Sequence, residues 1–441
     1  MSLHFRNLLI LMQSGVNQNS MKKQTVFAIS FSMLLFFQTN ISRAQGTEHW
    51  ITAWATAAYA QFSAPGVPEE PSLENKTIRM VIRPTLGGHS MRVRFSNEFG
   101  SLPVRIGAAH VAVTDRDSTT KQGTDHILSF AGKSSVSIPA GAPLISDPVE
   151  MDITPFTELT ISIYLPAKTP VTTLHGLAKH TSWFAAGDQS GSLNTVDALP
   201  RDSWFFLSSL EVLAPESASA IVAFGDSITD GAGARVSHYA DWPDKLAQRF
   251  AASRPNNHTA ILNEGISGNR ILHDAAGTAA LARFDRDVLG KSGVKGLIVL
   301  EGINDIGFPR IRMEELKSPS TPKNPFVSEK VSAEEIIAGL QQLIVRAHEH
   351  GILIFGATLT PFEGTNSWDA EGEAIRQSVN QWIRSARAYD GFIDFDAVIR
   401  DPKHPSRMKA IYDSGDHIHP SDAGYQVMAN AIDLNMLQTT K

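Results

Sequence analysis

A serine, a histidine and a carboxylate occupy positions in this sequence from which they could act together on a carbonyl group. Ser227 ends the motif Gly225-Asp226-Ser227, which directly follows the apolar run 221–224. Near the C-terminus, Asp416 and His419 lie three residues apart in Asp416-His417-Ile418-His419-Pro420. A serine hydroxyl is a weak nucleophile until a histidine accepts its proton and a carboxylate orients that histidine. The pattern therefore predicts nucleophilic catalysis of ester hydrolysis, with Ser227 as nucleophile, His419 as base and Asp416 as orienting acid.

The region that carries these residues alternates short apolar segments with helical ones. Strands are expected over 220–224, 260–262, 296–300, 352–357 and 391–395. The clearest helix is expected over 333–349, with Ser332 as N-cap and Glu335 three positions further on. Continuous apolar strands that alternate with helices predict a parallel sheet covered on both faces. In such sheets the catalytic groups lie at the carboxyl ends of strands, which is where Ser227, Gly268 and Asn304 stand.

The preceding region has a different periodicity. Between Trp50 and about Val212, short segments alternate apolar and polar residues, and turn-forming residues separate them. The segments with this alternation are 78–82, 91–95, 104–108, 136–138 and 159–165. Closely spaced short strands of this kind predict an all-β sandwich. We therefore expect a β-sandwich domain over residues 45–214 and a catalytic α/β domain over residues 218–441.

The first 44 residues have the pattern of a signal peptide, with Met21 as an alternative start. Lys22 and Lys23 precede an apolar run, and Ser42-Arg43-Ala44 forms a cleavage site with small residues. Cleavage after Ala44 leaves 35 basic and 45 acidic residues, a net charge of about −10. We expect a secreted or periplasmic protein that has no membrane anchor and binds no nucleic acid.

Composition narrows the chemistry further. The 441 residues are 42% hydrophobic and 19% charged, as in ordinary globular proteins. The chain has no cysteine, which excludes disulfides, thiolate metal sites and a cysteine nucleophile. The triad needs no cofactor and no metal, so none is expected.

Residues 218–441 resemble the SGNH (GDSL-type) hydrolase family. The resemblance rests on four blocks in the family's order, which are Gly225-Asp226-Ser227-Ile228, 263–269 with Gly268, Gly302-Ile303-Asn304-Asp305, and Asp416-His417-Ile418-His419-Pro420. Ile303 stands where the family commonly has a second glycine. The preceding region is similar to the N-terminal β-sandwich extension of some secreted bacterial esterases of this family.

The resemblance implies a flavodoxin-like three-layer fold and an oxyanion hole. The tetrahedral intermediate of ester hydrolysis carries a negative charge on the former carbonyl oxygen. The donors implied for that charge are the backbone N–H groups of Ser227 and Gly268 and the side-chain amide of Asn304. Asp226 is interpreted as a structural residue of the turn.

Two alternatives remain at this stage. His417 and His419, with Asp413 and Asp416, could form part of a metal site in a metal-dependent hydrolase. Alternatively, the sandwich could be the working part of a non-catalytic carbohydrate-binding protein, with candidate aromatic residues Trp50, Trp54, Trp183 and Trp204. For each tryptophan, packing in the core is the simpler explanation.

The substrate is less well defined than the chemistry, because the family acts on many esters. We expect a small-molecule or polysaccharide-borne ester, with a short-chain acyl or acetyl group. A lipase or lysophospholipase-type acylhydrolase, or an acyltransferase, on the same triad remains the alternative.

Two segments are candidates for the walls of the substrate pocket. The long segment 306–331 follows Asn304 and is expected to form one wall. Its charged residues make it unlike the apolar lid of a lipase. Phe362 and Trp368, which follow Thr360-Pro361, are candidates for another wall, although core packing is the simpler role for either.

Overall fold

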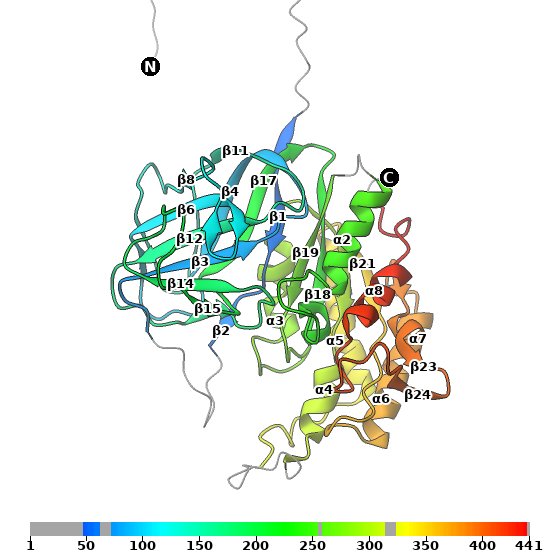
Figure 1. The fold of residues 1–441 in the computed structure, drawn as a ribbon. Coiled ribbons are helices and arrows are strands. Elements are labelled where there is room, and N and C mark those ends of the chain that lie inside the picture. The colour runs from blue at the N-terminus through cyan, green and yellow to red at the C-terminus, as the bar shows by residue number, and fades with distance from the viewer. Residues whose placement is uncertain (1–46, 62–71, 255–257, 314–322, 439–441) are drawn as a thin grey trace, which may run out of the picture. The chain divides into compact units, whose positions relative to one another are not determined.

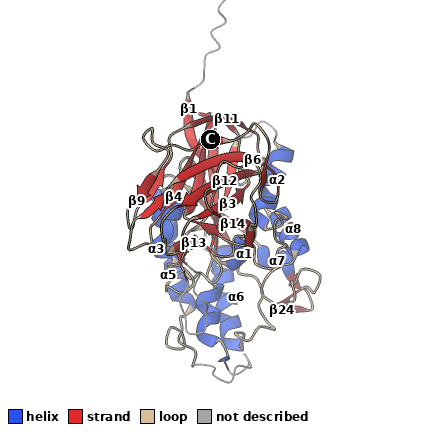
Figure 2. Cartoon of the chain, turned by 60° about the vertical axis from the view of Figure 1, so that its left-hand side comes forward, coloured by secondary structure: helices blue, strands red, loops and turns tan. Residues whose placement is uncertain are grey.

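The computed structural model describes residues 47–61, 72–254, 258–313 and 323–438. The expected signal peptide lies outside the described residues. Backbone contacts join residues Gly46–Lys441 into one unit. Strands form its N-terminal part, and strands and helices alternate in its C-terminal part (Figure 1). Figure 2 shows the same division, with the strands of the N-terminal part in the upper half of the view and most of the helices below them and to their right.

Two antiparallel sheets make up most of the N-terminal part. The seven-stranded sheet contains β15 (Leu199–Arg201), β14 (Ser182–Ala186), β3 (Lys76–Ile82), β12 (Leu159–Leu165), β6 (Ala108–Arg116), β7 (Thr119–Thr120) and β8 (His126–Ile127). The five-stranded sheet contains β1 (Glu48–Ala55), β17 (Leu207–Pro215), β4 (Gly88–Ser96), β10 (Pro143–Ile145) and β11 (Val149–Ile153). Smaller pairings join β2 (Tyr59–Ala60), β13 (Thr173–His175) and β16 (Trp204–Phe205), and β5 (Val104–Ile106) with β9 (Val136–Ile138). Helices begin only at Ser227 in the described part of the chain.

Alternation in sequence explains how these strands pack. On β4, Met91, Val93 and Phe95 are fully buried. The intervening Arg92 and Arg94 point to the opposite face, where both form ion pairs with Glu211 of β17. One face of the strand therefore contributes to the core, while the other is held by charge pairing.

The parallel sheet has the strand order β19-β18-β20-β21-β22. Its strands are β18 (Ser219–Gly225), β19 (Thr259–Gly265), β20 (Val294–Leu300), β21 (Leu353–Ala357) and β22 (Gly391–Ile393). In sequence order this is 2-1-3-4-5, the flavodoxin-like arrangement, in which ligands bind where the strand order reverses. The reversal lies between β18 and β20, so the segments after these strands face the expected site. The predicted α/β fold is confirmed.

Two groups of helices cover this sheet. One group packs α2 (Trp242–Ser253), α7 (Phe395–Ile399) and α8 (Asp422–Ala431), and the other packs α3 (Ala280–Phe284), α5 (Ala333–Glu349) and α6 (Ala370–Ser385). Short elements are α1 (Ser227–Asp230), η1 (Asp285–Leu289), α4 (Ile303–Gly307), η2 (Phe308–Arg310) and the hairpin β23 (Arg400–Asp401) with β24 (His404–Met408). Helix α5 has the predicted bounds and the reciprocal capping of Ser332 and Glu335. The strand expected over 391–395 ends at Ile393, because the Asp394 carboxylate accepts the backbone N–H of Ala397 and caps α7.

The N-terminal sheets and the parallel sheet share one hydrophobic core. Strand β1 packs against β19, and the backbone N–H of Thr52 donates to the carbonyl of Ser292 at 3.0 Å. Arg83 forms an ion pair with Asp244 of α2 at 2.9 Å. Only three residues separate β17 from β18. The β-rich part is therefore built onto the parallel-sheet part through buried contacts.

The four tryptophans considered for sugar binding divide into two pairs. Trp54 and Trp204 are buried and pack edge to face, with ring centroids 5.0 Å apart. Trp50 and Trp183 are half-buried, and the Arg92 guanidinium lies 4.4 Å from the centre of the Trp50 ring. Core packing is the role of the first pair, so these four residues do not form one exposed aromatic row.

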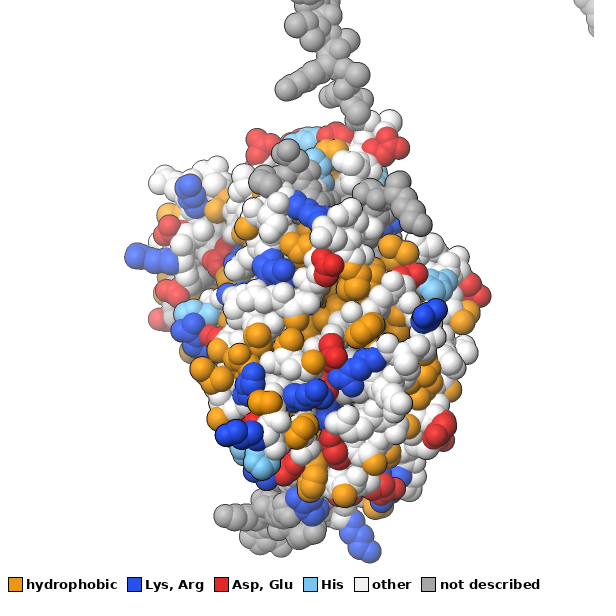
Figure 3. Space-filling view, turned by 90° about the vertical axis from the view of Figure 1, so that its right-hand side faces the viewer, with side chains coloured by type: hydrophobic (Ala, Val, Ile, Leu, Met, Phe, Trp, Pro, Cys, Tyr) orange, Lys and Arg blue, Asp and Glu red, His pale blue; other side chains and the backbone are white. Residues whose placement is uncertain are grey.

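On the face drawn in Figure 3, basic and acidic side chains are interspersed with hydrophobic ones. Among the helices that the structure describes, none combines the length and the apolar character needed to cross a lipid bilayer.

Candidate active site

Ser227, His419 and Asp416 form a continuous chain of hydrogen bonds. The Oγ of Ser227 lies 2.8 Å from the Nε2 of His419, and the Nδ1 of His419 lies 2.6 Å from the Oδ2 of Asp416. These distances are within the range for a nucleophile, its base and the group that orients the base. The three predicted residues are thus brought together in the predicted order.

The loop that carries the acid and the base is shaped by the acid itself. The Oδ1 of Asp416 accepts the backbone N–H groups of Ile418 and His419, at 3.1 and 2.9 Å. Partial burial raises the pKa of Asp416, but the hydrogen bonds and charge of His419 outweigh it and hold this pKa well below its usual range. Asp416 therefore remains a carboxylate, which is the form that orients an imidazole and stabilises its positive charge.

Ser227 stands where β18 ends and α1 begins. Asp226 caps this short helix, because its carboxylate accepts the backbone N–H of Ile228 at 2.9 Å. Gly225 allows the close approach that the turn requires, since a Cβ there would lie 2.3 Å from the carbonyl oxygen of Leu300. Burial raises the pKa of Asp226 to about 7, against the opposing effect of the Ile228 hydrogen bond. These contacts agree with the structural role expected for Asp226.

Gly268 follows β19 and adopts a left-handed backbone conformation, with φ of +82°. A Cβ there would lie 2.9 Å from the Cβ of Ala276.

The next residue, Asn269, is fixed from both sides. Its side-chain oxygen accepts the Nε–H of Arg283 at 2.8 Å, and its carbonyl accepts the side-chain amide of Asn304 at 2.9 Å. One amide hydrogen of Asn304 is thereby used for orientation, and the other is available to a substrate.

Asp305 fixes the same loop from the other side. Its carboxylate accepts the backbone N–H groups of Ile271 and Leu272, at 2.7 and 3.0 Å. Burial raises the pKa of Asp305 to about 6, although both hydrogen bonds lower it. The third motif block therefore holds the segment that directly follows the second block, which the sequence motifs alone did not indicate.

Comparison with known families agrees with this geometry. Residues 223–427 match the sequence model of the GDSL-like Lipase/Acylhydrolase family. Residues 223–427 therefore form a GDSL-like domain. The protein is accordingly an SGNH/GDSL-type carboxylic ester hydrolase, as the four sequence blocks predicted. A search of curated proteins found no match.

Several solved structures are similar to the GDSL domain. A variant of an acetyl xylan esterase from Geobacillus stearothermophilus is 22% identical, with a TM-score of 0.38, over 51% of this chain and 97% of the other. A protein of the G-D-S-L family from Desulfitobacterium hafniense is 19% identical, with a TM-score of 0.35, over 48% of this chain and 97% of the other. An α/β hydrolase from the metagenome of Lake Arreo, Spain, is 23% identical, with a TM-score of 0.37, over 51% of this chain and 98% of the other.

A cleft of about 490 Å³ opens above the nucleophile of the GDSL domain. Besides Ser227, Gly268, Asn304, Asp416 and His419, its walls comprise apolar residues (Leu177, Ala232, Ile303, Phe308, Ile311, Ile418) and small or polar ones (Ser267, Gly307, Gly364, Thr365, Asn366, Ser367). The segment after Asn304 does line the cleft, through Gly307, Phe308 and Ile311, and residues 314–322 of this segment lie outside the described residues.

Sequence reasoning missed two groups of cleft residues. Leu177 lies in the N-terminal part, about half exposed, and no pattern linked it to the site. The segment 364–367 lies between Phe362 and Trp368, the two aromatic candidates for a pocket wall. Phe362 is fully buried and Trp368 packs against the core. The bulky aromatic residues anchor this segment, while the small polar residues between them face the cleft.

The alternative metal site finds little support in the contacts of the two histidines. His417 pairs with Asp413 at 2.7 Å, whereas His419 pairs with Asp416 and faces Ser227. Each histidine thus has its own carboxylate. Within the described residues, no group of three or more His, Asp or Glu side chains is placed to hold a metal ion.

A further buried carboxyl group, besides those of Asp226 and Asp305, belongs to Glu301. Glu301 follows β20, is almost fully buried, and has its nearest basic partner, Arg283, at 3.6 Å. Burial raises the pKa of Glu301 well above its usual range, and the neighbouring charge of Asp226 raises it further. The buried position of Glu301 therefore favours its neutral form over the charged one.

Proposed function

We propose that the protein is a secreted serine esterase that hydrolyses short-chain acyl or acetyl esters through Ser227, His419 and Asp416. The observation that carries this proposal is the unbroken hydrogen-bond chain from Ser227 through His419 to Asp416, at the edge of an open cleft. Esters carried by carbohydrates are included among the proposed substrates.

In the proposed mechanism, the Oγ of Ser227 attacks the acyl carbonyl carbon while the Nε2 of His419 accepts the hydroxyl proton. The resulting imidazolium is stabilised by the carboxylate of Asp416. His419 then returns the proton to the leaving alcohol oxygen, and the carbon–oxygen bond of the ester breaks. A water molecule, deprotonated by His419, then attacks the carbonyl carbon of the acyl-serine. The bond between this carbon and the Oγ of Ser227 breaks, His419 returns the proton to that oxygen, and the carboxylic acid is released.

The backbone N–H groups of Ser227 and Gly268 and the Asn304 amide are proposed to stabilise the oxyanion. The left-handed Gly268 and the hydrogen bond from Asn304 to Asn269 support this assignment, because both fix donors before substrate arrives. Donors that need no reorganisation during the reaction contribute most to electrostatic catalysis.

The walls of the cleft support a short acyl group on a polar alcohol. Apolar contacts from Ile303, Phe308 and Ile311 can cover a small acyl group. The hydroxyl and amide groups of Thr365, Asn366 and Ser367 can bind the hydroxyl-rich alcohol part. A long acyl chain would instead require a continuous apolar channel.

A panel of esters tests this proposal. We expect kcat/KM to be highest for acetyl esters and to fall for butyryl and longer acyl groups, and we expect acetate release from acetylated xylan or pectin. The Ser227→Ala variant should release none. A preference for long-chain or phospholipid esters would replace the proposal by the lipase or lysophospholipase function, and transfer of the acyl group to an added alcohol in preference to water would indicate an acyltransferase.

Export to the periplasm or medium is the second part of the proposal. It rests on the sequence pattern of residues 21–44. Intact-mass analysis of the exported protein should give an N-terminus at or within a residue or two of Gln45. Recovery of only the full-length protein from the cytoplasm would contradict export without affecting the esterase assignment.

A further inference from the structure

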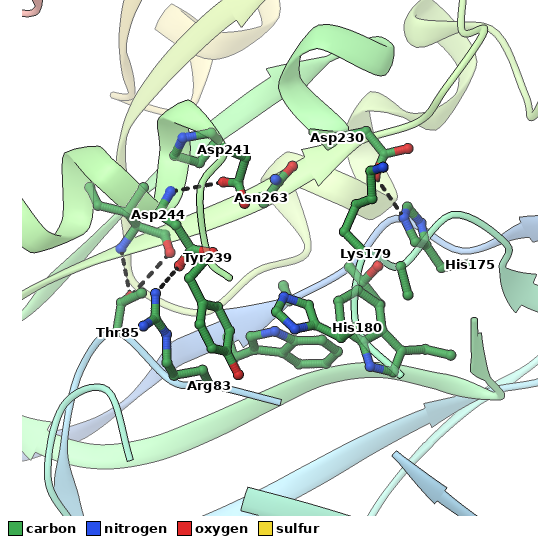
Figure 4. A pocket seen from close by; sticks show the side chains of 17 residues that line it. Arg83, Thr85, His175, Lys179, His180, Asp230, Tyr239, Asp241, Asp244 and Asn263 are labelled. Carbon is green, nitrogen blue, oxygen red and sulfur yellow. Dashed lines mark hydrogen bonds and ion pairs between the residues drawn. The ribbon is translucent and has the colours of Figure 1, made fainter. Parts of the chain in front are cut away.

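A buried contact joins the N-terminal β-rich part to the helix that carries the nucleophile. His175, the last residue of β13, places its Nε2 3.0 Å from the Oδ1 of Asp230 at the end of α1. The side chains of both residues are almost fully buried, with exposed fractions of 3% and 5%. Figure 4 shows the two side chains pointing toward one another at one side of a small pocket that both of them line.

The other oxygen of Asp230 holds the loop that leads to Gly268. Its Oδ2 accepts the backbone N–H of Ser267 at 2.9 Å and the Ser267 hydroxyl at 2.5 Å. Ser267 directly precedes Gly268, whose N–H is a proposed oxyanion donor. Since α1 begins at Ser227 and ends at Asp230, one carboxylate connects the nucleophile's helix to this loop.

His175 is itself fixed at both ring nitrogens. Its Nδ1 lies 2.8 Å from the carbonyl oxygen of Ala57, and its Nε2 faces the carboxylate. Both partners are acceptors, so the ring must donate from both nitrogens to satisfy them, as the imidazolium does. Burial lowers the pKa of His175, but the charge and hydrogen bond of Asp230 and the Ala57 carbonyl outweigh it and raise this pKa overall. The ring planes of Tyr59 and Trp204 enclose it, with centroids 5.7 Å away.

We propose that His175 is a positioning residue for catalysis. It acts through Asp230 to hold the Ser267–Gly268 loop in a fixed position relative to Ser227. This inference rests on the proposed oxyanion hole. A charge-assisted hydrogen bond in a buried site is stronger and more directional than a neutral one. It therefore restricts the rotation of the Asp230 carboxylate and, through it, the direction of the Gly268 N–H.

The position of Leu177 supports this role independently. Leu177 lies two residues after His175 and lines the catalytic cleft. The same short segment of the N-terminal part thus contributes one side chain to the cleft wall and another to the support of the oxyanion loop. The β-rich part completes the active site.

Two near-isosteric variants separate the two hydrogen bonds of His175. In His175→Gln, the amide nitrogen occupies roughly the position of Nε2 and can still donate to Asp230. In His175→Asn, the amide nitrogen corresponds to Nδ1, so that it reaches the Ala57 carbonyl but not Asp230. We expect kcat to fall about tenfold in His175→Asn and at most about threefold in His175→Gln, with KM within about twofold in both. The loss should stay below the roughly 10²–10³-fold cost of removing an oxyanion donor.

His180→Gln is the matched control. His180 is also a buried histidine of the N-terminal part and lines the same cavity, but it stacks on Trp204 and Tyr239, with centroids 5.6 and 4.4 Å away. We expect this variant to lose thermal stability to a similar degree while kcat stays within about twofold of wild type. If the two His175 variants have equal kcat values, or if His180→Gln loses as much kcat as His175→Asn, the positioning role is wrong.

The path through Asp230 is tested by combining variants. In an Asp230→Ala background, His175→Asn should lower kcat no further, because the carboxylate through which His175 acts is absent. A full additional tenfold loss would overturn the inference. Ser227→Ala is measured in parallel and distinguishes the two proposals. If this variant retains activity, the proposed function fails, whereas a wild-type-like His175→Asn beside an inactive Ser227→Ala refutes only the positioning role.

Discussion

The Oγ of Ser227 and the Nε2 of His419 lie 2.8 Å apart although 192 residues separate them in the chain. Close packing of two loops makes this approach possible. A Cβ on Gly233 would lie 3.0 Å from the Cβ of His419 and 2.7 Å from the carbonyl oxygen of Pro420, so the glycine leaves space for the histidine loop. The hydroxyl of Tyr425 on α8 donates to the carbonyl of Ala232 at 2.5 Å and holds the two segments together.

Replacing Asp416 should be less damaging than replacing His419. Without Asp416 the imidazole is misoriented but still accepts protons part of the time. We expect kcat of Asp416→Ala to exceed that of His419→Ala by about 10- to 100-fold, since nucleophile and base act as one unit. Steady-state kinetics with an acetyl ester measures both. Equal losses would mean that Asp416 does more than orient the base.

Asn304→Ala tests the proposed oxyanion hole. The expected loss is about 10²–10³-fold in kcat with little change in KM, because the amide meets a charge that exists only in the transition state. The melting temperature should remain close to wild type, which checks that the loop of Asn269 has kept its place. A strongly raised KM with unchanged kcat would make Asn304 a substrate-binding residue instead.

Gly268→Ala should impair both stability and catalysis. The left-handed conformation costs a non-glycine residue about 1–2 kcal/mol. The new Cβ would also meet Ala276 at 2.9 Å. A shift of the loop by about 1 Å would lower kcat by about 10²-fold. Gly123→Ala is the matched control, because Gly123 has φ of +79°, lies outside the cleft, and has no atom within 4 Å of the place where the new methyl group would lie. It should lose stability without losing kcat.

Glu301→Gln should stabilise the protein, and more so at alkaline pH. In the unfolded chain, Glu301 loses its proton above the ordinary glutamate pKa of 4.5. In the folded protein the pKa of Glu301 is raised, so the side chain keeps its proton to a higher pH. Wild-type stability therefore falls as the pH rises above that value, and the neutral glutamine removes this loss. Thermal unfolding at about pH 5 and about pH 8 measures the effect. If the melting temperatures of Glu301→Gln and wild type differ by the same amount at both pH values, a buried neutral Glu301 is contradicted.

Local patterns were enough to predict the parallel sheet and helix α5. Continuous apolar strands and the Ser332–Glu335 capping pair are encoded within a few residues, and the fold that contains them was confirmed. The strand ending at Ile393 was predicted too long, because the helix-capping role of Asp394 outweighs the apolar pattern that continues through Phe395.

Sequence patterns did not predict the contacts between distant segments. His175, Asp230 and Leu177 belong to no motif that connects them, and their association depends on how the β-rich N-terminal part packs against α1 and the cleft. Asp305 was visible as part of a motif block, but its hydrogen bonds to Ile271 and Leu272 required the paired strands β18, β19 and β20.

Covalent labelling tests the central claim most directly. The protein is treated with a sulfonyl fluoride or an organophosphate, and the modified residue is located by mass spectrometry of its peptides, while a parallel sample is treated with EDTA. The account predicts that Ser227 alone is modified, that ester hydrolysis stops in proportion to the labelling, and that EDTA leaves hydrolysis intact. Full activity with Ser227 modified, or activity lost in EDTA and restored by zinc, would contradict it.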